Sequence, residues 1–154
     1  MPTDLTWAED QDERFAGRFH SSMPYQSNKI ELIIDNDGES FESGLKLMLE
    51  TLDQLESLDR QAKNIISKDL RETYNDGWRE YEELQSDGSY LTITHPPLSE
   101  PEFVSKFKLE HVEVMSASVL TLWYGQSELF AGHSIFVESL DGLNLNDAEA
   151  QMFG

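Results

Sequence analysis

The 154-residue chain contains no cysteine. Disulfide bonds, zinc sites built on thiolates, iron–sulfur clusters and a cysteine nucleophile are therefore excluded. This absence fits a reducing compartment, so we expect a cytoplasmic protein. The chain also lacks any apolar run near the roughly 20 residues that span a bilayer, and its first residues are acidic and polar. We therefore expect neither a transmembrane helix nor a signal peptide.

Basic residues are scarce as well. Eleven lysines and arginines stand against thirty aspartates and glutamates, which gives a net charge of −19 and a pI near 4.3. Such a chain repels nucleic-acid phosphates and anionic lipids and attracts basic protein surfaces. We therefore expect no nucleic acid and no membrane as partner. Two interpretations of the acidity stay open, because it either keeps the protein soluble or forms a surface for a basic partner.

Motifs for catalysis and metal binding are missing too. The phosphate-binding patterns GxxxxGK[ST] and GxGxxG and the nucleophile elbow GxSxG do not occur. Residues 35–40, DNDGES, resemble part of a calcium loop, but in its frame the first ligand position falls on Ile33 and the twelfth on Gly44 instead of a glutamate. His111 and Glu113 can share a strand face, yet two ligands do not make a metal site. We predict no metal, no cofactor and no catalytic residues.

The apolar pattern that is present indicates one domain over residues 1–154. Residues 1–14 form an acidic N-terminal segment that can supply an edge strand. Residues 21–28, SSMPYQSN, are predicted to be a turn or loop. Residues 29–35, KIELIID, alternate in the way of a strand and end at turn residues.

A helical period follows this strand. From Phe41 to Tyr74 apolar residues recur at intervals of three and four, and Ser40 is a suitable N-cap. The stretch is long for one helix, so we predict two helices with a break near residues 57–60. Gly77 is predicted to end the second helix in the left-handed conformation, and Trp78 is expected to pack against the sheet or the helix ends.

Residues 79–101 are polar and poorly periodic. They contain an acidic cluster, an SDG turn and a short strand predicted over residues 90–94. Residues 95–101, HPPLSEP, cannot form a central strand, because each of their three prolines lacks the backbone N–H that a strand donates.

The C-terminal third reads as an antiparallel meander. Strands are predicted over residues 109–115, 119–124 and 129–137, with a hairpin turn at residues 125–127. The second of these strands is apolar on both faces and should lie inside the sheet. Residues 144–153 form either a last strand or a short helix. Strands, then helices, then strands predict an α+β fold: a mainly antiparallel sheet with two long helices packed on one face.

The stretch LFAGHSIFV, residues 129–137, contains a glycine and a histidine inside its predicted strand. Strict alternation would place His133 among aliphatic side chains, which favours a hydrogen-bonded structural histidine. Gly132 would then leave room for a large ring such as Trp123 or Trp78. An enzymatic site around His133 and nearby carboxylates stays open as an alternative.

Two motifs carry a resemblance to a known family. Tyr74-Asn75-Asp76-Gly77-Trp78 matches a YNxxW element, and Leu129 to Val137 matches an LFxGHxIxV strand. Over roughly residues 15–154 the chain resembles an uncharacterised bacterial family that is known only as a domain of unknown function. The resemblance marks Asn75, Trp78, Gly132 and His133 as its signature. It implies a small cytosolic α+β protein, similar to some immunity proteins that neutralise the toxins of neighbouring bacteria.

Charge and resemblance together lead to a functional hypothesis: a non-enzymatic, immunity-type inhibitor that blocks a basic toxin domain, such as a nuclease, through an acidic surface. The candidate partner-binding residues come from two acidic clusters, and they are Asp10, Asp12, Glu13, Glu80, Glu82, Glu83 and Asp87. A module that self-associates through exposed sheet edges is the remaining alternative.

Overall fold

The structure is a computed structural model that describes residues 4–154. A seven-stranded sheet has the order β1-β2-β3-β6-β7-β8-β9, and β4 and β5 form a separate two-stranded sheet. The first three residues of the predicted acidic segment lie outside the described residues. Within residues 4–154, no helix is both long enough and apolar enough to cross a bilayer.

The elements follow one another in a simple order. The strands are β1 (Ala8–Glu9), β2 (Arg18–Tyr25), β3 (Asn28–Asp35), β4 (Glu80–Leu84), β5 (Tyr90–Thr94), β6 (His111–Met115), β7 (Val119–Gln126), β8 (Ser134–Ser139) and β9 (Glu149–Phe153). The helices are α1 (Phe41–Asp53), α2 (Leu55–Thr73) and α3 (Glu100–Val104), and short helical turns are η1 (Glu13–Phe15), η2 (Tyr74–Trp78) and η3 (Glu128–Phe130).

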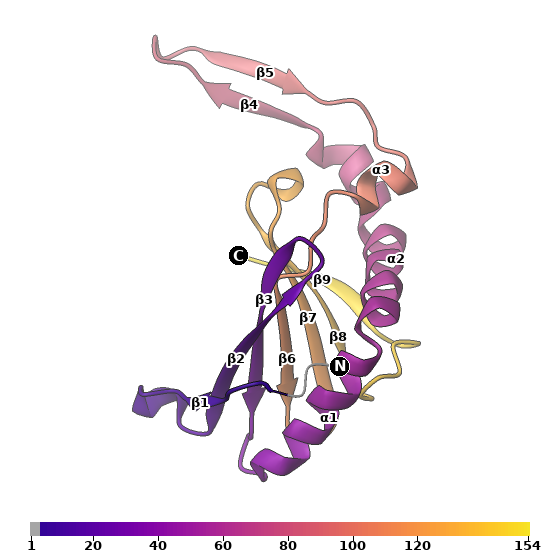
Figure 1. Cartoon of the computed structure of the whole chain (residues 1–154). Helices are drawn as coiled ribbons and strands as arrows, with labels where there is room; N and C mark the ends of the chain where they lie inside the picture. Colours follow the sequence, from indigo (N-terminus) through magenta and orange to yellow (C-terminus); the bar gives the residue numbers. More distant parts are fainter. Residues whose placement is uncertain (1–3) are drawn as a thin grey trace.

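The long helices α1 and α2 lie across one face of the large sheet, and the small sheet projects from one end of the molecule (Figure 1). Neighbouring strands run antiparallel except β3 and β6, which are parallel. The predicted α+β fold with a mainly antiparallel sheet and two long helices is confirmed. The parallel pair arises because the chain leaves β3, crosses the sheet through the helices and re-enters at β6.

The core lies between the helices and the sheet. Ile30, Leu32 and Ile34 of β3 are completely buried on the face that alternation predicts. Strand β7 lies between β6 and β8, so its two apolar faces correctly predict an interior position. Strand β1 pairs only with β2 and forms one edge of the sheet inside the acidic N-terminal segment.

Ser40 caps α1 as predicted, because its side chain accepts a hydrogen bond from the backbone N–H of Ser43. The break between the helices is at Gln54, and the prediction of a break near residues 57–60 is wrong. Thr51 is completely buried, and its hydroxyl donates to the carbonyl of Leu47 at 2.8 Å. Back-bonding of this kind slightly destabilises a helix, and α1 ends two residues later at Asp53.

Asp59 fastens α2 to the sheet. The residue is 3% exposed, and its carboxylate accepts hydrogen bonds from the hydroxyls of Tyr124 at 2.7 Å and Tyr25 at 2.8 Å. Lys63, one turn along α2, lies 3.4 Å from the same carboxylate. Burial raises the pKa values of both tyrosines, so both hydroxyls stay protonated and continue to donate.

The end of α2 differs from the prediction at Gly77. Residues Tyr74–Trp78 continue as one π-helical turn, and Gly77 does not adopt a positive φ. The turn widens the helix instead of stopping it, so no left-handed residue is needed. Trp78 packs with its ring centroid 5.5 Å from that of Phe130 and 5.5 Å from that of His133.

The chain around Gly132 is also not the strand that was predicted. Strand β7 continues to Gln126 through the predicted hairpin turn, and β8 begins only at Ser134. Between them, Ala131 and Gly132 have φ values of 53° and 84°, far from the negative φ values of a regular strand. Residues 144–153 were expected to form either a last strand or a short helix, and the structure has the strand, β9.

Strand β2 covers most of the segment predicted as a loop at residues 21–28. Met23 and Tyr25 pack against the core and hold the strand in place, and the chain turns only at Gln26 and Ser27. Pro24 is tolerated because β1 pairs with β2 only at Phe19 and His20, which leaves the outer side of the strand open at the proline.

Candidate functional site: the β4–β5 arm and its root

We call β4 and β5, with the turn between them, the arm. The arm extends away from the large sheet and the long helices (Figure 1). Every residue of β4 is exposed, as is every residue of β5 except the half-buried Ile93. Apolar side chains at the tip are no exception, since Leu84, Tyr90 and Leu91 are 63%, 66% and 52% exposed. The arm therefore has no core of its own.

The pairing of the two strands gives the arm two different faces. Since side chains alternate along a strand, one face carries Glu80, Glu82, Leu84, Tyr90, Thr92 and Thr94. The other face carries Tyr81, Glu83, Leu91 and Ile93. Three of the candidate partner-binding glutamates therefore lie on β4, two on the first face and one on the second.

The free edge of β4 offers backbone groups as well as carboxylates. The N–H of His95 donates to the carbonyl of Arg79, and the N–H of Gln85 donates to that of Ser89. In an antiparallel pair such bonded residues alternate with residues whose N–H and C=O point outward. Glu80, Glu82 and Leu84 are the outward-pointing residues of β4.

Asp87 holds the turn at the tip. Its carboxylate accepts hydrogen bonds from the hydroxyl of Ser89 at 2.5 Å and from the backbone N–H of Ser89 at 2.9 Å. These bonds lower the pKa of Asp87, the hydroxyl bond being the larger cause. Gly88, with φ of 85°, completes the turn. Asp87 therefore has a local structural task besides its charge.

Asn75 joins the root of the arm to the segment before α3. Its side-chain oxygen accepts from the N–H of Leu98 at 2.9 Å, and its side-chain nitrogen donates to the carbonyl of Leu98 at 3.1 Å. Arg79 donates to the carbonyls of Asn75 and His95. The π-helical turn brings these groups together. The segment that leads into β4 and the segment that follows β5 are therefore both held to the body.

His133 lies next to this root and not among aliphatic side chains. The residue is half-buried, its Nδ1 lies 2.6 Å from the carbonyl oxygen of Phe130, and its ring contacts that of Trp78. A Cβ at Gly132 would meet nothing within 4 Å, so Gly132 does not make room for a ring. Its φ of 84° is what requires glycine, because the chain must turn sharply before β8.

The second acidic cluster lies at the other end of the molecule, around β1 and η1 (Figure 1). Asp12 caps η1 and contacts Arg14 at 2.6 Å, and the side-chain bond from Arg14 is the main reason for the lowered pKa of Asp12. Asp10 accepts from the N–H of Asp12, which lowers its pKa, and lies 3.2 Å from His20. Glu13 lies in the exposed first turn of η1.

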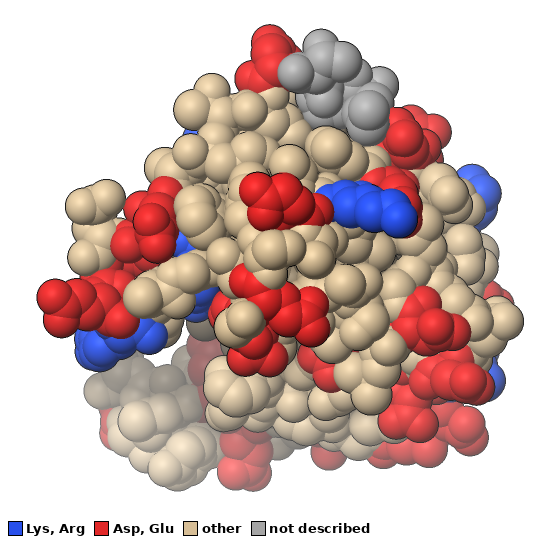
Figure 2. Space-filling view, turned by 90° about the horizontal axis from the view of Figure 1, so that it is seen from below, with Lys and Arg blue, Asp and Glu red and all other residues tan. Residues whose placement is uncertain are grey.

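The two clusters therefore do not form one patch. Figure 2, which views the molecule from below, shows carboxylates in several separate groups with lysines and arginines between them. Both clusters lie beside a strand edge, but they differ in their apolar side chains. The N-terminal cluster has Phe15, which is 40% exposed with Arg14 and Arg18 over its ring, whereas Leu84, Tyr90 and Leu91 of the arm are each more than half exposed.

The uncovered face of the large sheet carries a different cluster. His111 and Glu113 share this face, as alternation predicts, and Arg18 lies 3.6 Å from Glu113. Burial raises the pKa of Glu113, against the opposing effect of the Arg18 charge. Within the described residues, no group of three or more histidines, aspartates or glutamates is arranged to hold a metal ion.

The comparison with known proteins identifies a family. Residues 7–149 match the family described as "Uncharacterized protein conserved in bacteria (DUF2262)". The chain belongs to this family. No curated protein and no solved structure matches the chain. The match spans both helices, the arm and the sheet up to the start of β9, so the arm belongs to the part of the chain that matches the family.

Proposed function

We propose that this member of the family is a non-enzymatic, cytoplasmic binding protein that holds a basic protein partner through the arm. An immunity-type inhibitor of a basic toxin domain, such as a nuclease, would have this role. The observation that carries the proposal is the arm itself: three glutamates and several large apolar residues stand on a strand pair that packs against no core.

The physical support is the mismatch between what the arm contains and what the fold needs. Exposed apolar side chains gain nothing from the body, and they become favourable when a partner covers them. A net charge of −19 accelerates encounter with a cationic surface and makes the association sensitive to salt. The outward backbone groups of β4 would allow an extended segment of the partner to add as a further strand.

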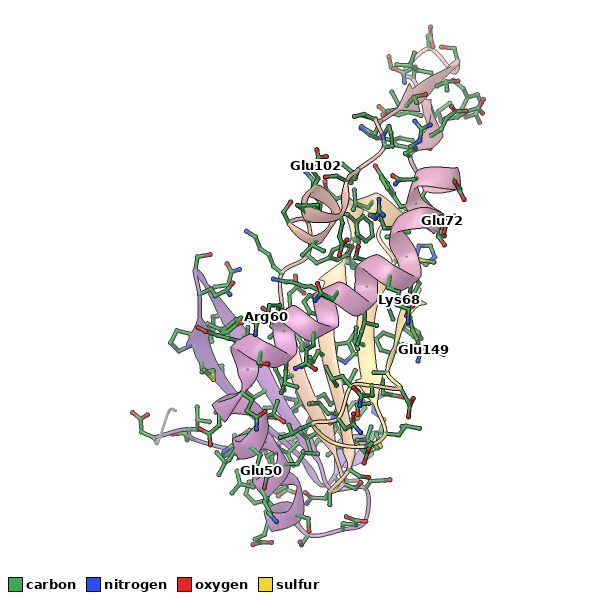
Figure 3. All side chains as sticks on the ribbon, turned by 90° about the vertical axis from the view of Figure 1, so that its right-hand side faces the viewer. Glu50, Arg60, Lys68, Glu72, Glu102 and Glu149 are labelled. Carbon is green, nitrogen blue, oxygen red and sulfur yellow. The ribbon has the colours of Figure 1, made fainter. Side chains whose placement is uncertain are left out.

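A matched pair of charge variants tests the proposal. E80Q/E82Q/E83Q removes three charges from the arm, and E39Q/E50Q/E72Q removes three charges from exposed positions elsewhere. Glu50 and Glu72 lie on the helical side of the molecule (Figure 3). Each variant, and the unchanged protein, is co-expressed with the products of neighbouring genes and purified at low and at high salt.

The expected result is a basic partner that co-purifies at low salt, is lost with the arm variant and is kept by the control. The absence of any basic partner at low salt, or equal losses with both variants, contradicts the proposal.

Self-association is the second candidate, because Leu84, Tyr90 and Leu91 are exposed beside two free strand edges. Light scattering over a range of concentrations separates the candidates. A monomer supports the heterologous partner, whereas a dimer that dissociates on Leu91→Ser supports self-association.

A further inference from the structure

A cavity of about 680 Å³ lies at the root of the arm, and it is separate from the acidic face of β4. Its walls come from η2, the base of the arm, the proline segment after β5 and the chain around η3. The volume falls within the range of small-molecule sites, which are mostly apolar and carry a few placed polar groups. What lines the cavity therefore indicates what it can hold.

Aromatic rings make up much of the lining, and packing against the body fixes the positions of Tyr74 and Trp78. Tyr74 contacts the rings of Phe103 and Phe130, and Trp78 contacts Phe130. From the arm, Tyr81 lies against the ring of His95, with centroids 5.8 Å apart. Such walls suit a flat ring, because aromatic pairs gain from offset and edge-to-face contacts beyond simple burial.

Tyr74 supplies an unused hydrogen-bonding group. The residue is 2% exposed and lines the cavity, yet its hydroxyl makes no hydrogen bond to any described residue. Burial raises the pKa of Tyr74, so the hydroxyl keeps its proton at neutral pH. Because the hydroxyl oxygen is accessible from the cavity, a ligand there can replace water as its hydrogen-bonding partner.

The charged groups on the lining are one cation and one anion, Lys106 and Glu128. A ligand with one carboxylate and one ammonium group matches both. The field of a chain with net charge −19 disfavours a purely anionic ligand, whereas a zwitterion carries no net charge into that field.

We propose that this cavity binds a free amino acid with an aromatic side chain. The ring lies among Trp78, Tyr81 and Tyr74, the carboxylate faces Lys106 and the Tyr74 hydroxyl, and the ammonium group faces Glu128. This proposal does not depend on the basic partner of the arm, since Glu80, Glu82 and Glu83 do not line the cavity.

Four ligands that differ by one group each test the assignment by titration calorimetry on the full chain. Phenylalanine carries all three groups, phenylalaninamide lacks the carboxylate, 3-phenylpropionate lacks the ammonium and leucine lacks the ring. We expect saturable binding of phenylalanine, tyrosine or tryptophan with a Kd below about 1 mM, and at least about tenfold weaker binding of each incomplete ligand. The proposal is overturned when no aromatic amino acid binds up to about 10 mM, or when leucine binds as tightly as phenylalanine.

Variants locate the site. Lys106→Gln is expected to weaken phenylalanine at least about tenfold and to leave phenylalaninamide unchanged, whereas Lys108→Gln, an exposed lysine outside the lining, changes neither. Tyr74→Phe keeps the packed ring and the thermal stability but weakens binding. Equal affinities of Lys106→Gln and the unchanged protein would place the ligand elsewhere and overturn the proposal. E80Q/E82Q/E83Q keeps amino-acid binding, so failure of either proposal leaves the other testable.

Discussion

In the body, the apolar side chains of β3 that face the helices are completely buried, whereas more than half of each of Leu84, Tyr90 and Leu91 in the arm is exposed. Both regions are strands held by regular backbone pairing. The difference is that α1 and α2 cover one face of the body's sheet, whereas the arm has exposed side chains on both of its faces.

This contrast separates two roles in one chain. Burial of apolar surface contributes roughly 25 cal/mol per Å², so the body supplies the free energy of folding and the arm adds little to it. An isolated two-stranded hairpin is marginally stable in water, and the arm depends on its root at Asn75 and Arg79. The exposure of these apolar residues is the basis of the proposal that the arm contacts a partner.

The sharpest test of the body is Asp59→Ala. The change leaves the buried Tyr124 hydroxyl, the half-buried Tyr25 hydroxyl and Lys63 without their shared partner, so we expect a loss of about 3–5 kcal/mol in the free energy of unfolding. Chemical denaturation measures the loss, with the exposed Asp53→Ala as control. A loss no larger than that of the control would mean that the network does not hold α2 to the sheet.

Gly44→Ala tests how closely α1 approaches β3. A Cβ at Gly44 would lie 2.6 Å from Cγ2 of Ile34, so the helix must shift away from the sheet. We expect a loss of about 1–3 kcal/mol, although alanine favours helix in an open position. Asn64→Ala, at an exposed site in α2, should be neutral or slightly stabilising, and a stabilising Gly44→Ala would contradict the packing.

Alkaline pH tests the same network through Tyr124. Burial and the Asp59 charge raise its pKa in the folded state, so the stability that its protonated form contributes is complete below about pH 10 and is lost as the pH rises further. We expect the free energy of unfolding to fall by up to about 1.4 kcal/mol per pH unit through this tyrosine. Tyr124→Phe should make the fall of the unfolding free energy with pH less steep. If the fall stays as steep, groups other than Tyr124 cause it.

The smallest effect is expected in the arm. Leu91→Ser should change the free energy of unfolding by less than about 0.5 kcal/mol, because the side chain is already exposed. Leu32→Ala in β3 should cost about 2–5 kcal/mol. Denaturation curves of the two variants measure both losses. Similar losses would contradict the contrast between the arm and the body.

Local signals in the sequence predicted most of the body correctly. Alternation in residues 29–35 and the three- and four-residue period after Phe41 were enough, because a buried face leaves a regular pattern. Ser40 was recognisable as a cap because its type and place follow directly from the unpaired N–H groups of a helix start. The parallel pairing of β3 with β6 was not predictable, because it depends on how the chain crosses the sheet.

Predictions failed where the backbone departs from a regular element. Alternation of residues 129–137 gave no sign of the turn at Ala131 and Gly132, and Gly77 has the residue type of a helix end without its conformation. Strand β4 was missed because an exposed strand has no buried face and so no pattern. The SDG turn beside the predicted strand at residues 90–94 was the available signal, since a strand after a tight turn needs a partner.

Replacement of residues 80–94 by Asn-Gly tests the central claim that the arm binds and the body folds. Arg79 and His95 already form a bonded pair that a two-residue turn can close. Thermal unfolding and co-purification with neighbouring gene products are measured on the same preparation. We predict an unchanged midpoint and complete loss of the basic partner. A shortened protein that unfolds, or that keeps the partner, would contradict the account.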